Sequence, residues 1–379
     1  MVHKQTSADS RVTLALASVP EMRVSRRFGV LIAALSTLVT GVGVAAARPV
    51  ALATPLCGVA TVSSALVPRP TALRVASYNI LHGLTSEGDR TLEARLTVDV
   101  DELAASQVDV VGIQEAEEST KHGRVIARLA GLLASRTQHS WYWCWFRTEP
   151  HVNGTPDTRP GGGSRVSDLL AAHYNANESS WYEGAAVLSR WPIVASAVHR
   201  LPGENPVQRV MGDCRPPSFA GDPTCVIDVA LEPRAAVWTR IATPSGPISF
   251  TSTHTSGNWE QSLDLVRWVA QQSRHERSAY LVCDCNSGER SRAQQVIRAH
   301  DWVDTYRLFH PYGGASADQE LGAPGPTVTQ RIDYVFVRAK SALRPAAVAE
   351  FMNVPEPSTV EPSGVLWPSD HWGVIATLR

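Results

Sequence analysis

Short apolar runs separated by polar residues recur from residue 72 to the end of the chain, and they predict strands and helices. Residues 108–113 (VDVVGI) have the composition of a buried strand, whereas 122–135 place Val125, Leu129 and Leu132 at helical spacing. Strands in large number with few helices between them indicate an α+β protein, in which paired mixed sheets lie between outer helices. The predicted strands are 73–78, 108–113, 141–146, 184–189, 235–242, 248–253, 280–283, 332–337 and 373–378, and the predicted helices are 92–106, 122–135, 260–274 and 292–300.

Residues 141–146 (WYWCWF) are strongly aromatic. They form either a core strand or an aromatic surface for a ligand or a membrane. Because aromatic residues are ordinary in strands and are mostly buried, we favour the core strand. Residues 154–165 (GTPDTRPGGGSR) are rich in glycine and predict a loop.

The first 47 residues differ from the rest of the chain. Arg23, Arg26 and Arg27 form a basic head, residues 28–47 carry no charge, and Ala45-Ala46-Ala47 supplies small residues for cleavage. This layout is typical of a secretory signal peptide and predicts export with cleavage near Ala47. The alternative is a membrane anchor over Phe28–Ala47, because about 20 apolar residues span a bilayer. Met22 is a second candidate start.

The predicted organisation is an N-terminal extension with signal peptide over 1–47, a linker over 48–71 and one domain over 72–379. The linker prediction comes from its Ala, Pro, Val and Ser composition, which has no clear period. Neither an internal repeat nor a second linker interrupts the sequence of the domain.

The formal charge is -1 for the 379 residues. Removal of residues 1–47 takes away five basic and two acidic residues and leaves -4. No general basic field therefore exists to attract a polyanion, and any contact with nucleic acid would rest on a local basic patch.

Six cysteines in an exported chain predict some disulfide pairing. The best pair is Cys214 with Cys225, which bracket a Pro-rich loop (DCRPPSFAGDPTC). The pairing of Cys57, in the linker, and of Cys144 stays open.

Polar side chains follow the predicted strands at the points where the strands end. An amide or carboxylate at a strand end is usually a turn residue, but many such positions in one domain indicate a shared site, because strand ends converge on one rim. Oxygen ligands suit a hard ion such as Mg²⁺ or Mn²⁺, and histidines suit acid–base work on a phosphate. These residues are Asn79, Glu115, His254, Asp284, Asn286, Asp333, Asp370 and His371.

Seven motifs occur in the order seen in the endonuclease/exonuclease/phosphatase superfamily, which the chain resembles over about residues 72–379. They are SYNILHG (77–83), DVVGIQE (109–115), GAAVLSRWPI (184–193), PRAAVW with SFTSTH (233–254), VCDCN (282–286), RIDYVFV (331–337) and SDHWGV (369–374). The resemblance implies the deoxyribonuclease-I-like four-layer sandwich, in which two packed mixed β-sheets are flanked by helices.

The resemblance also implies roles for individual residues. Glu115 and Asp370 are similar to the metal carboxylates, with Asn79 close by. Asp284 and Asn286 match the pair that meets the phosphate and the attacking water. His371, oriented by Asp333, and His254 resemble the two histidines beside the phosphate. Glu183 matches less closely the acid that orients the second histidine, and Arg234 matches a basic residue near the cleft.

The function implied is metal-dependent hydrolysis of a phosphoester, with a water polarised by Asp284 attacking phosphorus. The substrate is a phosphodiester of a nucleic acid or a phospholipid head group, and we expect a monomer with no obligate protein partner. Nuclease ranks slightly above a sphingomyelinase-like lipid phosphodiesterase, and an inositol phosphatase ranks last. The rival class is a non-catalytic binding module, which would have lost His371, Asp284 or Glu115, but all three are present.

Residues 281–290 read LVCDCNSGER, with two cysteines around the predicted catalytic aspartate. Side chains alternate along an extended chain, so Asp284 and Asn286 share one face and Cys283 and Cys285 the other. The family commonly has Gly-Asp-Phe-Asn here. Residues two apart in a strand are near the upper distance limit for a disulfide, and a zinc site lacks further soft ligands nearby. We therefore expect a carboxylate site beside two unreactive, buried cysteines.

Overall fold

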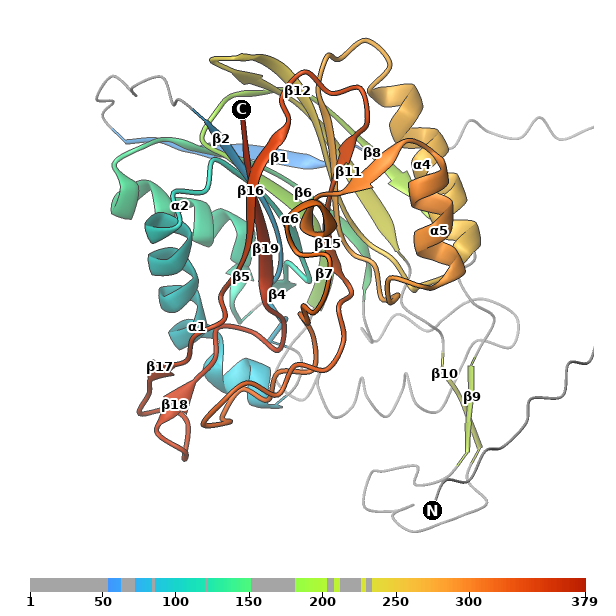
Figure 1. Cartoon of the computed structure of the whole chain (residues 1–379). Helices are drawn as coiled ribbons and strands as arrows, with labels where there is room; N and C mark the ends of the chain where they lie inside the picture. Colours follow the sequence, from blue (N-terminus) through green and yellow to red (C-terminus); the bar gives the residue numbers. More distant parts are fainter. Residues whose placement is uncertain are drawn as a thin grey trace, which may run out of the picture. The chain divides into compact units, whose positions relative to one another are not determined.

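Two mixed sheets pack face to face between two layers of helices in the computed structural model (Figure 1). It describes residues 54–62, 72–83, 86–119, 121–150, 181–202, 208–211, 226–229 and 234–379. The helices are α1 (Ser86–Ala105), α2 (Val125–Thr137), α4 (Trp259–Gln272), α5 (Arg292–Ala299) and the short α6 (Thr305–Phe309). The predicted fold class is confirmed.

The first sheet contains β4 (Glu118–Ser119) and β5 (Gly123–Arg124) at its side and otherwise has one continuous strand order. That order is β1 (Leu56–Ala60), β6 (Trp141–Pro150), β7 (Trp181–Ser189), β3 (Val110–Gln114), β2 (Leu73–Asn79), β19 (Gly373–Leu378) and β16 (Pro345–Phe351). Helices α1 and α2 cover its outer face through an apolar cluster that includes Leu96, Leu103, Leu129 and Ile113.

The second sheet has the order β14 (Trp302–Asp304), β15 (Asp333–Arg338), β13 (Ala279–Asp284), β12 (Gly246–His254), β11 (Ala235–Thr243) and β8 (Ile193–Arg200). Helices α4 and α5 cover it through Leu265, Val269 and Ile297. Two small ribbons lie outside both sheets: β9 (Gln208–Met211) with β10 (Val226–Val229), and β17 (Glu356–Pro357) with β18 (Val365–Leu366).

The core between the sheets is apolar and tightly packed. Val75, Val110, Phe250 and Val335 contribute to it from both sheets, and all four are fully buried. A Cβ atom added at Gly112 would lie 2.2 Å from Cγ2 of Val282, so only glycine allows the sheets to approach this closely at β3.

Strand directions bring the chemistry-bearing strand ends together. β2 runs parallel to β3, and β12 runs parallel to β13, so each pair of strands ends on the same side. β15 begins opposite the last residue of β13, with Asp333 paired to Asp284. We call this end of the two sheets the site end, and the opposite end, where β2, β3 and β13 begin and β15 and β19 finish, the far end.

The aromatic segment 141–146 is a core strand, as we expected. Its tryptophans are almost fully buried, and Trp145 donates a hydrogen bond from Nε1 to the carbonyl of Ala116 at 2.9 Å. It does not form an exposed aromatic surface.

The predicted linker over 48–71 contains a strand. β1 pairs antiparallel with β6, with Cys57 opposite Cys144, and these two residues form a disulfide with a Cα–Cα distance of 4.1 Å. The linker composition hides this strand because LCGVA is short and lacks a clear alternating pattern.

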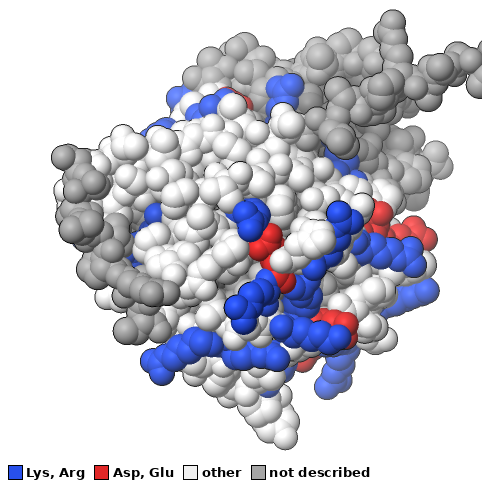
Figure 2. All heavy atoms as spheres, turned by 90° about the horizontal axis from the view of Figure 1, so that it is seen from above, with Lys and Arg blue, Asp and Glu red and all other residues white. Residues whose placement is uncertain are grey.

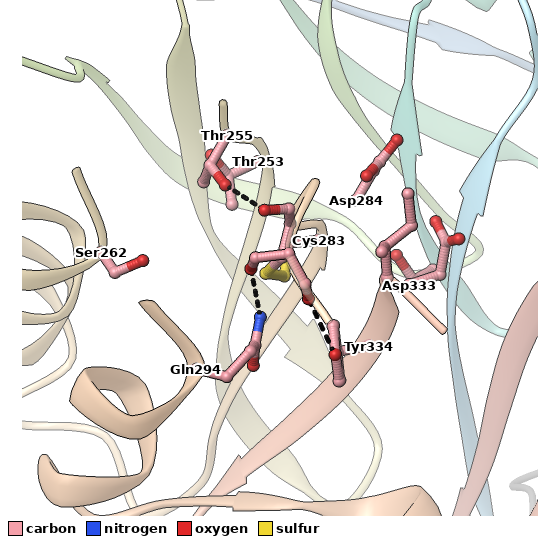
Figure 3. The surroundings of a disulfide bond; sticks show 12 residues. Thr253, Thr255, Ser262, Cys283, Asp284, Gln294, Asp333 and Tyr334 are labelled. Carbon is pink, nitrogen blue, oxygen red and sulfur yellow. Dashed lines mark hydrogen bonds between the residues drawn. A yellow bond between two sulfur atoms is a disulfide. The ribbon is translucent and has the colours of Figure 1, made fainter. Parts of the chain in front are cut away.

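Our expectation of two unreactive cysteines at 283 and 285 is wrong, because they form a disulfide (Figure 3). They share one face, as predicted, but β13 ends at Asp284, so Cys285 lies just beyond the strand. The Cα–Cα distance is 5.1 Å, within bridging range. Figure 3 shows the Asp284 side chain pointing away from the sulfur atoms.

Three predictions fall outside the described residues: the signal peptide, the loop 154–165 and the Cys214–Cys225 disulfide. Within the described residues, no helix has the length and apolar character needed to cross a membrane.

Replacement of Asp99 by asparagine should stabilise the protein at neutral and higher pH. Asp99 is buried in α1 and accepts a hydrogen bond from the Tyr78 hydroxyl at 2.7 Å. Burial raises the pKa of this carboxyl to about 7, against roughly 4 in an unfolded chain. The free energy of unfolding of the wild type therefore falls as the pH rises from about 4 to about 7. The loss is on the order of a few kcal/mol, because each pKa unit of difference contributes about 1.4 kcal/mol.

Denaturant unfolding of wild type and Asp99→Asn at about pH 4, 6 and 8 measures this effect. The variant should match the wild type at the lowest pH and exceed it at the highest, since asparagine can still accept the Tyr78 hydrogen bond. A stability difference that is the same at all three pH values would contradict the prediction.

Candidate active site

Asp284 is the centre of the polar residues at the site end. Its Oδ2 accepts a hydrogen bond from Asn79 Nδ2 at 3.0 Å and lies 3.4 Å from His254 Nε2 and 3.8 Å from His371 Nε2. Its Oδ1 accepts a hydrogen bond from the backbone N–H of Asn286 at 3.0 Å. One buried carboxylate thus lies close to residues from β2, β12, the loop after β13 and the segment just before β19.

Glu115 lies beside this centre, directly after β3. Asn79 Nδ2 donates to its Oε1 at 2.9 Å, and the backbone N–H of His82 donates to its Oε2 at 3.2 Å. The residue has a φ of 57°, so the chain turns sharply where the strand ends. Burial alone would raise the pKa of Glu115, but His82 and His254 outweigh it and hold the pKa at about 2. Glu115 is therefore ionised at any ordinary pH.

Asp333 fixes the orientation of His371, and Ser316 in turn fixes Asp333. Its Nδ1 is 2.9 Å from Oδ2 of Asp333, and the Ser316 hydroxyl donates to the same oxygen at 2.7 Å. Burial lowers the pKa of His371, but the charges of Asp333 and Asp284 outweigh it and raise the pKa well above the usual value. The imidazole is thus fixed in orientation, with Nε2 directed to Asp284, and favours the protonated form.

His254 is oriented from both ring nitrogens. Nη1 of Arg234 lies 2.8 Å from Nδ1. Nε2 faces Asp284 and lies 2.8 Å from Nδ2 of Asn286. Glu183 contacts Arg234 at 3.4 Å. Arg234 thus contacts both Glu183 and His254.

The donor set fits a hard divalent cation. Three groups of residues each have ligand atoms within 4.8 Å of one another. The groups are Glu115 with His254 and Asp284; Asp284 with Asp333 and His371; and His82 with Glu115 and Glu183. Asp370 belongs to no such group among the described residues, but it is close enough for the charge of Glu115 to raise its pKa, in addition to burial. Two neighbouring carboxylates that repel one another are stabilised by a cation.

Three contributors were missed in the sequence. His82, inside the SYNILHG motif, has Nε2 3.5 Å from Glu115. Ser369 donates to the carbonyl of Asn79 at 2.7 Å and precedes Asp370 in SDHWGV. Both were visible in motifs already identified. Ser316, which holds Asp333, lies in a loop of small residues with no pattern that indicates its role.

Comparisons with known proteins identify relatives of the whole domain. A family model described as "Endonuclease/Exonuclease/phosphatase family" matches residues 76–371. A search of curated protein sequences finds no match.

Solved structures with the same fold include two family proteins and a phosphatase. The family protein from Leptotrichia buccalis C-1013-b has 16% identity and a TM-score of 0.52, covering 81% of this chain and 100% of its own. The family protein from Bacteroides thetaiotaomicron has 15% identity and a TM-score of 0.53, and the match covers 82% of this chain and 95% of that protein. The mannosyl-6-phosphatase of Bacteroides thetaiotaomicron VPI-5482 has 16% identity and a TM-score of 0.52, and the match covers 81% of this chain and 99% of that protein.

Proposed function

The chain belongs to the endonuclease/exonuclease/phosphatase family of phosphoric ester hydrolases, and on this premise we propose that it is an exported, metal-dependent phosphodiesterase. The observation that supports the reaction best is the arrangement around Asp284, where one carboxylate is in reach of two histidines and two amides. A rigid, buried base beside cationic or neutral imidazole donors suits attack of water on a phosphoester.

In the proposed reaction, Asp284 accepts a proton from the attacking water and Asn286 orients the phosphate. His371, held protonated by Asp333, donates a hydrogen bond to a phosphate oxygen as negative charge develops there. His254 directs Nε2 to the same region, because Arg234 occupies its other nitrogen. Glu115 and Asp370, with Asn79, would hold Mg²⁺ or Mn²⁺, which would supply further charge neutralisation at the phosphate.

We propose a diester rather than a monoester, with nucleic acid as the first candidate. Burial of the aromatic strand 141–146 removes the lipid-facing surface that would have favoured a sphingomyelinase-like enzyme. The likeness to a mannosyl-6-phosphatase at 16% identity concerns the fold and carries no substrate to this chain.

The test is an activity panel on the protein with Mg²⁺ or Mn²⁺. Plasmid DNA, RNA, sphingomyelin and bis-p-nitrophenyl phosphate represent diesters, and p-nitrophenyl phosphate and mannose 6-phosphate represent monoesters. We expect hydrolysis of nucleic acid and of the small diester. Turnover of monoesters alone, with every diester intact, would refute the proposal.

Export is proposed from the basic head and apolar run at residues 23–47, and the Cys57–Cys144 and Cys283–Cys285 disulfides support it. Disulfides persist in oxidising compartments and are rare in the cytosol. N-terminal sequencing of protein recovered from the culture medium should find a start near Arg48. A membrane-bound form that retains Phe28–Ala47 would contradict cleavage.

A further inference from the structure

The far end of the two sheets carries a dense group of basic side chains. Figure 2 looks onto this end and shows Lys and Arg residues gathered around a few carboxylates. We define the far-end basic surface as Arg74, Arg190, Arg277, Lys340, Arg344 and Arg379. This is notable in a chain with a formal charge of -1, where a basic field has to be local.

Backbone hydrogen bonds show that these residues are neighbours. Arg344 and Arg379 exchange N–H···O bonds at 2.8 and 2.9 Å, and Ala342 donates to the carbonyl of Arg277 at 2.9 Å. On the other side, Asp109 donates to the carbonyl of Arg74, and Arg190 donates to the carbonyl of Asp109, both at 2.9 Å. The surface is therefore continuous from the end of β7 to the start of β13.

Strand order gives the surface its dimensions. Arg190, Arg74, Arg379 and Arg344 lie at the ends of β7, β2, β19 and β16, which are separated only by β3 in the first sheet. Four strand spacings give a row of roughly 19 Å. Arg277 and Lys340 adjoin β13 and β15 of the second sheet, about 10 Å away, the usual distance between packed sheets.

Nearby carboxylates leave about half of this charge unbalanced. Asp109 is buried against Arg190 at 2.8 Å, and Glu276 pairs with Arg240 at 2.6 Å. Asp301 is exposed, and the terminal carboxylate of Arg379 is close by. In the described part of the chain, Arg277, Lys340, Arg344 and Arg379 are exposed and form no ion pair with a carboxylate side chain.

We propose that the far-end basic surface binds duplex nucleic acid through its phosphates. Arginine matches phosphate geometry with two parallel hydrogen bonds, and five of the six residues are arginine. A duplex presents two phosphate backbones across grooves of about 6 to 12 Å, comparable with the separation of the two basic rows.

Other polyanion surfaces fit less well. Single strands stack on exposed aromatic rings, and membrane-binding surfaces use Trp and Tyr as interfacial anchors. The exposed aromatic side chains of the described residues, Phe309 and Tyr312, lie in and after α6 and outside the far-end loops. Recognition at the far end therefore rests on charge, without base contacts and without insertion into lipid.

This surface is separate from the candidate active site. The strands β2, β3, β12 and β13 run from the far end to the site end, so a duplex bound at the far end does not cover Asp284. Binding does not depend on the proposed hydrolysis.

The test compares two triple variants of the full chain. Arg277→Gln/Arg344→Gln/Arg379→Gln removes three exposed charges from the surface, and Arg267→Gln/Arg290→Gln/Arg292→Gln removes three exposed charges from α4, α5 and the preceding loop. Binding to a fluorescent duplex of about 25 base pairs is measured by anisotropy in EDTA, from about 50 to about 200 mM salt. Thermal unfolding checks that both variants are folded.

The far-end variant should bind at least about tenfold more weakly at the lower salt, and its slope of log K against log salt should be shallower by about 3. The control variant should keep wild-type affinity within about threefold. Equal affinities of the two variants would overturn the proposal. So would an unchanged duplex affinity together with loss of binding to phosphatidylglycerol vesicles, which would assign the surface to a membrane.

Discussion

Replacing Asp284 with asparagine should lower kcat for diester hydrolysis by about 10²-fold or more. Asparagine has nearly the same shape, and its oxygen can still accept the hydrogen bond from the Asn286 N–H or from Asn79. It cannot take a proton from water, and it removes the negative charge that raises the pKa of His371. The loss should therefore appear in kcat, with KM changed far less.

The control is Asp301→Asn, an exposed aspartate at the far end with a φ of 66°, a conformation that asparagine tolerates. It should keep full activity. His371→Ala should lower kcat by a similar factor, whereas the exposed His300→Ala should not. If Asp284→Asn retains turnover while remaining folded, Asp284 is not the base and the proposed mechanism is wrong.

Removal of divalent metal should abolish activity, and Mg²⁺ or Mn²⁺ should restore it. Glu115→Gln should raise the concentration of Mg²⁺ needed for half-maximal activity by at least about tenfold, since a carboxylate ligand becomes a neutral amide. The variant should approach wild-type turnover only at high Mg²⁺. Glu320→Gln, at an exposed position, is the matched control and should need no extra metal.

The pH dependence of this metal requirement follows from the two carboxylates. Glu115, with a pKa of about 2, stays ionised, whereas burial and the charge of Glu115 raise the pKa of Asp370. The metal concentration needed for activity should therefore increase as the pH falls, because Asp370 takes up a proton while Glu115 stays ionised. Isothermal titration with Mn²⁺ at several pH values measures it. Full activity after exhaustive EDTA treatment would exclude a metal-dependent reaction.

The sequence predicted that these residues lie near one another because they are close to strand ends. Asn79, His254 and Asp284 follow apolar runs that could form only buried strands, and parallel pairing then brings the ends together. Long-range geometry was harder to foresee. Arg234 contacts Glu183 from one sheet and His254 from the other, and no local sequence pattern encodes those distances.

Two features could not be predicted for a physical reason. Ser316 reaches Asp333 only because the long segment after α6 folds back onto the site end, where Ala317 pairs with His371. The Cys283–Cys285 disulfide lies where β13 ends, and an extended-strand rule applied to these residues overestimates their separation.

The Cys57–Cys144 disulfide has a consequence for how the protein responds to proteases. A single cut between Val62 and Ala72 would leave β1 covalently attached to β6, because the bond joins residues 87 positions apart on either side of the cut. The nicked protein would migrate as one species without reductant and would release a small N-terminal fragment only after reduction. Its first sheet would keep its edge strand, so proteolysis at this point would change the covalent connectivity of the chain but not the composition of the folded particle.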